Sequence, residues 1–140
     1  MYNDTKIFAL DPAGALQCLL VPACDELGVE LSVFAGVDAL ERRLSFDMPD
    51  LLLLGGVEVS GRELEMLRVL LAETGRAAPR VLFCSALAFD FRVYQQLKLL
   101  GVDRMMPRPA NANELGAEIA GLLGLGQWDP TQFDAVAGVR

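Results

Sequence analysis

The sequence predicts an α/β protein built on a parallel, doubly wound sheet. The first observation is the run of residues 50–54, Asp-Leu-Leu-Leu-Leu, which follows a proline and ends at Gly55-Gly56. Such flanks favour a short strand buried on both faces, and this kind of strand needs helices on both sides of a parallel sheet. The second observation is that strand-like and helix-like patterns alternate five times along the chain, the order typical of βα units.

The first strand–helix unit and the strand after it are predicted near the N-terminus. Residues 6–10 form an apolar run that stops at an Asp-Pro pair and predict a strand. Residues 15–27 carry apolar side chains at helical spacing and end at Gly28, so they predict a helix. Pro22 lies inside this helix and should kink or divide it. Residues 30–34 alternate between polar and apolar side chains and predict an edge strand.

The middle of the chain continues the alternation. Residues 37–44 predict a short helix with one apolar face, and the leucine strand at residues 50–54 follows it. Residues 61–74 then predict a longer helix with many apolar side chains, which Gly75 and Pro79 bring to an end.

The last two units have the same pattern of a short strand followed by an amphipathic helix. They comprise strands at residues 80–84 and 104–106 and helices at residues 89–100 and 113–123. Gly101 ends the first of these helices, and Asn111 or Asn113 provides the N-cap of the second.

Right-handed crossovers with helices on both faces predict a flavodoxin-like (βα)5 three-layer sandwich, with the parallel strand order 2-1-3-4-5. We expect residues 1–123 to form this domain and residues 124–140 to be a C-terminal tail or the start of a linker. Trp128 and Phe133 are unusual in a free linker. We expect them to dock on their own domain; the alternative is that they pack on a following domain or a second chain.

Composition narrows the possible functions. The net charge of −7 argues against direct binding of nucleic acid, because that affinity comes mainly from lysine and arginine. The chain has no histidine, so histidine-assisted nucleophiles and histidine metal sites are excluded. Cys18, Cys24 and Cys84 show no metal-site spacing and are expected to be reduced and mostly buried. Without a signal-peptide pattern or a run long enough to span a bilayer, we expect a cytoplasmic protein that does not enter membranes.

Four segments of the chain form a recognisable series, at residues 6–11, 49–54, 81–86 and 101–109. In this order and spacing they resemble the CheY-like receiver domain of bacterial response regulators. The most specific of them is residues 101–109, Gly-Val-Asp-Arg-Met-Met-Pro-Arg-Pro, because a Gly-Val-Asp turn before a Pro-basic-Pro motif is typical of receivers. The other three segments are residues 6–11, 49–54 and 81–86. The resemblance covers residues 6–123, the size of a small domain, and implies a place in two-component signal transduction.

The resemblance also implies a phosphorylation site, and this chain departs from it. In the family, an aspartate at the end of the third strand accepts the phosphoryl group, and two acids after the first strand hold Mg²⁺. The acceptor position falls on Gly55, which has no carboxylate. Of the acid pair, Asp11 is retained and the second position falls on Pro12. With one acid left, Mg²⁺ should bind weakly or not at all, and no cofactor is expected.

Three further positions of the family pocket map onto this chain. Ser85 matches the hydroxyl that binds the phosphoryl group, Arg108 stands where the family has lysine, and Met105 replaces the aromatic residue that reports the state. We expect Ser85 to cap the following helix and Arg108 to pair with Asp11 across the degenerate pocket. Glu58 is expected to be a solvated loop carboxylate; the alternative is a displaced acceptor or metal ligand.

These substitutions predict a pseudo-receiver: a non-enzymatic, phosphorylation-independent signalling domain that acts through protein–protein contacts. The resemblance implies dimerisation or partner docking through the fourth helix, the fifth strand and the fifth helix. The candidate interface residues are Phe91, Tyr94, Leu99, Trp128 and Phe133. A C-terminal effector domain in a longer chain is a further expected partner. The alternative function is a small-ligand sensor that uses the space left at Gly55. An active enzyme is the least favoured interpretation.

Overall fold

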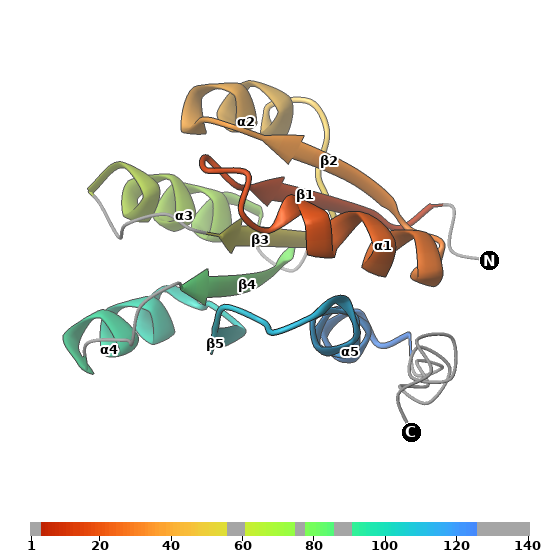
Figure 1. Ribbon diagram of the computed structural model, residues 1–140. Helices are drawn as coiled ribbons and strands as arrows, with labels where there is room; N and C mark the ends of the chain where they lie inside the picture. Colours follow the sequence, from red (N-terminus) through yellow and green to blue (C-terminus); the bar gives the residue numbers. More distant parts are fainter. Residues whose placement is uncertain (1–3, 56–60, 75–77, 86–90, 126–140) are drawn as a thin grey trace.

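The computed structural model describes residues 4–55, 61–74, 78–85 and 91–125, in which five strands and five helices alternate (Figure 1). The strands are β1 Lys6–Leu10, β2 Glu30–Phe34, β3 Leu51–Gly55, β4 Arg80–Ser85 and β5 Arg104–Pro107. The helices are α1 Gln17–Leu27, α2 Val37–Leu44, α3 Gly61–Thr74, α4 Phe91–Leu100 and α5 Ala112–Leu123. All paired strands are parallel, and the sheet has the order β2-β1-β3-β4-β5. The predicted fold class and strand order are confirmed.

Strand β3 is the centre of the sheet, as its leucine run predicts. The side chains of Leu51, Leu52, Leu53 and Leu54 are all 0% exposed. Successive side chains of a strand point to opposite faces, so Leu51 and Leu53 pack in one core cluster while Leu52 and Leu54 pack in the other. Burying a leucine side chain stabilises the fold by roughly 1.5–3 kcal/mol, so these four residues contribute to both halves of the core.

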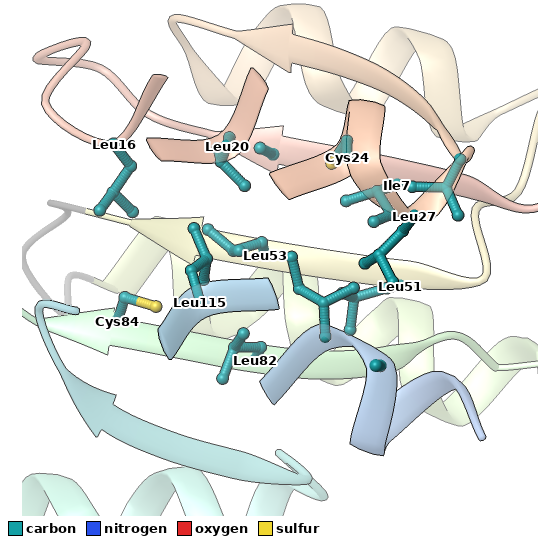
Figure 2. Packing of buried hydrophobic residues seen from close by; sticks show 14 of the residues in the cluster. Ile7, Leu16, Leu20, Cys24, Leu27, Leu51, Leu53, Leu82, Cys84 and Leu115 are labelled. Carbon is teal, nitrogen blue, oxygen red and sulfur yellow. The ribbon is translucent and has the colours of Figure 1, made fainter. Parts of the chain in front are cut away.

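The helices form two layers, one on each face of the sheet. Helices α1 and α5 pack on the face of Leu51 and Leu53, through residues such as Leu20 and Leu115 (Figure 2). Helices α2, α3 and α4 cover the opposite face, where the core contains Leu40, Leu67 and Leu97. None of the helices in the described ranges is long and apolar enough to span a membrane.

Helix α1 differs from its prediction at its start and at its proline. It begins at Gln17 rather than at residue 15, and it continues through Pro22 to Leu27 as one helix. The predicted division at Pro22 is therefore wrong. A proline removes one hydrogen bond to the carbonyl four residues earlier, here Cys18 in the first turn. Because Cys18 and Pro22 are both exposed, water can bind that carbonyl, and the buried face of the helix is undisturbed.

The ends of the other elements lie close to their predicted positions. Strands β3, β4 and β5 each continue one residue further than predicted, and helix α4 begins at Phe91. Asn111 is the N-cap of α5, and its side chain accepts a hydrogen bond from the Glu114 N–H at 2.8 Å. Gly124 has a left-handed conformation with φ 67° and ends α5, at the predicted limit of the domain.

Candidate functional site

The carboxyl ends of four strands meet at one edge of the sheet, where ligands of doubly wound proteins bind. Asp11 follows β1, Gly55 ends β3, Ser85 ends β4 and Arg108 follows β5. The strand register pairs the ends of neighbouring strands with one another. The strand ends thus bring together the positions that the resemblance assigns to the phosphorylation pocket.

Asp11 organises the loop between β1 and α1. Its side chain is only 2% exposed, and its Oδ2 atom accepts a hydrogen bond from the Leu16 N–H at 3.0 Å. Its backbone carbonyl accepts a hydrogen bond from the Gly14 N–H at 3.0 Å, in a turn that Gly14 permits with φ 69°. The carboxylate therefore provides a partner for a backbone donor at the start of a helix whose N-cap residue offers no side-chain acceptor.

Leu16 occupies the space that a side chain at Gly55 would need. Figure 2 shows the Leu16 side chain directed toward the end of β3, and it is only 2% exposed. A Cβ atom added to Gly55 would clash with the Leu16 Cδ1 atom and lie 3.2 Å from its Cγ atom. The two residues are therefore complementary: the missing side chain at Gly55 leaves a hollow, and Leu16 fills it.

Arg108 holds the same loop from the other side, and its partner differs from the prediction. Its Nη2 atom donates a hydrogen bond to the Ala15 carbonyl at 3.0 Å. The predicted pair between Arg108 and Asp11 is wrong, because Asp11 Oδ2 accepts from Leu16 and Asp11 Oδ1 is buried without a hydrogen bond among the described residues. Leu16 is buried while the Arg108 side chain stays exposed, so the guanidinium reaches the outer surface of the loop instead.

The remaining predicted pocket residues contribute less to this geometry. Pro12 is exposed in the loop after Asp11. Met105 is partly buried and packs against the core cluster on the α2–α4 face. The backbone of Ser85 ends β4, but its side chain lies outside the described residues, so its predicted capping role is untested. Three more predicted residues also lie outside: Glu58, Trp128 and Phe133.

The residues at this edge do not fit the Mg²⁺ site that the fold is known for. Mg²⁺ needs a nearly octahedral set of oxygen ligands and usually one or two carboxylates beside its waters. The pocket positions offer the carboxylate of Asp11 alone, and one of its oxygens already binds the Leu16 N–H. Within the described ranges, no three His, Cys, Asp or Glu side chains are grouped so that they could hold a metal ion.

Helix α4 presents apolar side chains to solvent, among them three of the candidate interface residues. Phe91 is 70% exposed, Leu99 is 89% exposed and Tyr94 is 39% exposed. Lys98 lies over the Tyr94 ring, with its Nζ atom 5.7 Å from the ring centroid.

Beside this helix, Arg104 of β5 donates two hydrogen bonds to Glu118 of α5, at 3.0 and 3.1 Å. These hydrogen bonds raise the pKa of Arg104, and Tyr94 adds a smaller contribution. The aromatic ring of α4 thus lies near an ion pair that joins β5 to α5.

Sequence reasoning missed the role of Leu16. Its apolar side chain fits the helical spacing of the residues after it, so it was assigned to the buried face of α1. Two signals in the sequence could have distinguished Leu16 from the helical residues that follow it. Gly14, two residues earlier, permits a turn, and Gly55 at the end of β3 needs a neighbour to fill its space.

Comparison with known proteins identifies the fold. No family model and no curated sequence matches the chain. Several solved structures of response regulators do match. An orphan response regulator of H. pylori, HP1043, superposes with a TM-score of 0.74 at 14% identity, over 88% of this chain and 99% of that one.

Two further structures agree. A CheY-like receiver domain from Methanospirillum hungatei has a TM-score of 0.71 at 16% identity, over 86% of this chain and 94% of its own. The chemotaxis response regulator CheY4 of Vibrio cholerae has a TM-score of 0.71 at 13% identity, over 84% and 98%. Similarity at this level of identity identifies the fold: the chain has the CheY-like receiver fold of response regulators, with a loop folded over the edge where the strands end.

Proposed function

We propose that this protein is a phosphorylation-independent receiver domain that signals through protein contacts and catalyses no reaction. The observation that carries the proposal is the filling of Gly55 by Leu16 at the end of β3. A receiver accepts its phosphoryl group on a carboxylate at this position, whereas Gly55 has none and a buried methyl group lies in its place.

The surroundings of Gly55 argue against phosphoryl transfer for a second reason. Transfer of a phosphoryl group requires positive charge, usually metal ions, to offset the charge that develops on its oxygens. Here Asp11 binds a backbone N–H and Arg108 binds a backbone carbonyl, so both charged groups stabilise one arrangement of the loop. Because these hydrogen bonds hold the loop and Leu16 packs over the end of β3, the loop is suited to a single fixed conformation.

Without phosphoryl transfer, the domain acts through contacts made by its surface. Three apolar side chains of α4 are exposed, and Arg104 and Glu118 form an ion pair next to them. Exposed aromatic residues beside paired charges are typical of the centre and the rim of a protein interface. We propose that the face of α4, β5 and α5 forms a dimer or binds a protein partner, in the cytoplasm and in a longer chain with a C-terminal effector domain.

Phosphorylation is tested directly by mass spectrometry. The protein is incubated with Mg²⁺ and acetyl phosphate, and a receiver that retains its acceptor aspartate is treated in parallel. The control should gain one phosphoryl group, while this protein should keep its mass. A gain of one phosphoryl group by this protein would show that another residue accepts it and would refute the proposal.

The contact surface is tested by sedimentation. We expect self-association at high concentration that weakens in Phe91→Ala and Leu99→Ala, because both side chains are more than two-thirds exposed on α4. Val21→Ala is the matched control, since Val21 is an exposed apolar residue of α1, on the other side of the sheet. A protein that stays monomeric at high concentration, with no change in Phe91→Ala, would contradict the dimer.

The alternative of a small-ligand sensor loses its structural basis. It required space at Gly55, and Leu16 fills that space. A ligand could enter there only by displacing a buried leucine and the two hydrogen bonds that hold its loop.

A further inference from the structure

The sheet has two edge strands, and they differ in how open they are to a further strand. Strand β5 is short, ends at Pro107 and carries Arg104, whose guanidinium group is bound to Glu118 of α5. Shortness, proline and charge protect an edge from pairing with another chain. Strand β2, at the other edge (Figure 1), pairs with β1 over all five of its residues and contains no proline, lysine or arginine. The edge of β2 is therefore the one that can accept an added strand.

The open backbone groups of β2 belong to Leu31 and Val33. Glu30 donates its N–H to the Thr5 carbonyl, and the Phe34 carbonyl accepts from the loop after β1, both at 2.9 Å, so these two residues of β2 are directed toward β1. In a parallel ladder, successive residues direct their N–H and C=O groups to opposite sides. Leu31 and Val33 therefore direct theirs away from the sheet, where no described residue is hydrogen-bonded to them. Two N–H and two C=O groups are left for an added strand.

Side chains on both faces hold β2 in its extended conformation. Leu31 and Val33 pack against the core cluster under α1 and α5. Phe34 packs on the opposite face, where its ring meets the Phe8 ring edge to face with the centroids 5.4 Å apart. Helix α2 contributes the buried Leu40 to this second cluster, so it packs on the face of the sheet. Because the edge is already fixed, an added strand would lose only its own conformational freedom on binding.

The charges near the start of β2 indicate which sequence the added strand has. Glu30 is exposed at the first position of β2, and Asp25 and Glu26 are exposed in the last turn of α1, which leads into it. None of the three forms an ion pair with a described residue. Lys6 lies opposite Glu30 in the register, but its Nζ atom binds Asp47 at 2.7 Å. A second copy, with its net charge of −7, would be repelled here, whereas a basic segment would be attracted.

From these observations we propose that the edge of β2 binds an extended, basic segment of a partner protein, which adds a strand to the sheet. The segment exchanges hydrogen bonds with Leu31 and Val33, and its basic residues lie beside Glu30. Antiparallel pairing is the more stable arrangement per residue, and it places the carboxyl end of the segment next to the start of β2. This contact is separate from the face of α4, β5 and α5, because β2 and β5 are at opposite edges of the sheet.

Synthetic peptides test the proposal on the full 140-residue chain. The probe alternates valine and threonine, has lysines at its carboxyl end and carries fluorescein at its amino end, so that fluorescence anisotropy measures its binding. We expect saturable binding, with slower hydrogen exchange of the Leu31 and Val33 amides in the complex. The same peptide with its valine and threonine amides N-methylated lacks the donors and should bind at least about tenfold more weakly. A peptide with glutamates in place of the lysines should be weaker by a similar factor.

Val33→Pro tests the same edge from the side of the protein. Proline removes the outward N–H of Val33, and edge strands accept proline where the N–H faces solvent, so the fold should persist. Binding of the lysine peptide should fall about tenfold, whereas Val33→Thr, which keeps the N–H and a β-branched side chain, should bind it as the unaltered protein does.

Three results would each overturn the proposal: no saturable binding of the lysine peptide, equal binding of either control peptide, or full binding by a folded Val33→Pro variant. If Val33→Pro does not fold, the N-methylated peptide still decides whether the backbone of the edge is used. Slower exchange of the Leu31 and Val33 amides at high protein concentration without peptide would also overturn the proposal, because the occupant would then be a second copy.

Discussion

Because Leu16 fills the space beside Gly55, the effect of Gly55→Ala on the free energy of unfolding should change sign when Leu16 is shortened to alanine. In the unaltered protein, Gly55→Ala introduces a Cβ atom that clashes with the Leu16 side chain. Overpacking of this kind costs about 1–3 kcal/mol of the free energy of unfolding. We expect the lower part of that range, since the clashing atom is a terminal methyl carbon that can move by rotation of the side chain.

The same substitution should stabilise the protein once Leu16 is shortened. Leu16→Ala alone removes a buried side chain and should cost about 2–5 kcal/mol. In that background the clash is gone and the new methyl group partly fills the cavity. Gly55 does not have a positive φ, so alanine fits its backbone and lowers the entropy of the unfolded chain, a gain of about 0.4–1 kcal/mol.

Urea unfolding of the four proteins, followed by far-UV circular dichroism, measures this double-mutant cycle. We expect a coupling free energy of about 1–3 kcal/mol between the two sites. Leu122→Ala is the control partner, because Leu122 packs on the same core cluster but lies beside the starts of β3 and β4, at the other edge of the sheet. Its effect should add to that of Gly55→Ala within about 0.5 kcal/mol. Additivity of Leu16→Ala and Gly55→Ala would refute the packing that we derive for the strand end.

Two further predictions concern titratable groups. Burial raises the pKa of Cys24 and Cys84 to about 12, so Ellman's reagent at neutral pH should modify Cys18 alone in the folded protein and all three thiols in urea. Rapid modification of more than one thiol before unfolding would contradict the burial of the other two. The hydrogen bond from Lys6 is the largest of the effects that lower the pKa of Asp47, so the stability that Asp47 contributes should be present at neutral pH and lost as the pH falls below roughly 4. Asp47→Asn should therefore lower the urea midpoint at about pH 7 and lower it less at about pH 3, and an equal effect at both would contradict the assignment.

Local patterns were sufficient to predict the fold. The run from Leu51 to Leu54 has no polar residue that could face water, so a strand made from it must lie inside a sheet covered on both sides. Gly28 and Gly101 end their helices with positive φ values of 72° and 101°, which few other residues adopt. These features depend on near neighbours in the chain, and a sequence displays near neighbours directly.

The errors arose where the partner of a residue is distant in sequence. Arg108 was expected to bind the nearest opposite charge in the pocket, Asp11, but it binds the Ala15 carbonyl 93 positions away. The hydrogen-bond partner of Arg108 depends on how deeply each acceptor is buried. Asp11 lies under the loop, and a guanidinium group that reached it would lose its bound water. Pro22 was expected to disrupt its helix, yet packing of the opposite face against α5 and the sheet keeps α1 continuous.

The absence of a carboxylate at Gly55 and the five-stranded parallel sheet could both be predicted from residue types and their order, because a missing carboxylate and a hydrophobic period are properties of the residues. The group that occupies the position of the missing side chain depends instead on three-dimensional packing. Leu16 fills it because Asp11, Gly14 and Arg108 bend and hold the loop after β1 over the end of β3. That arrangement depends on hydrogen bonds and close packing among three separate segments, which no single stretch of the sequence contains.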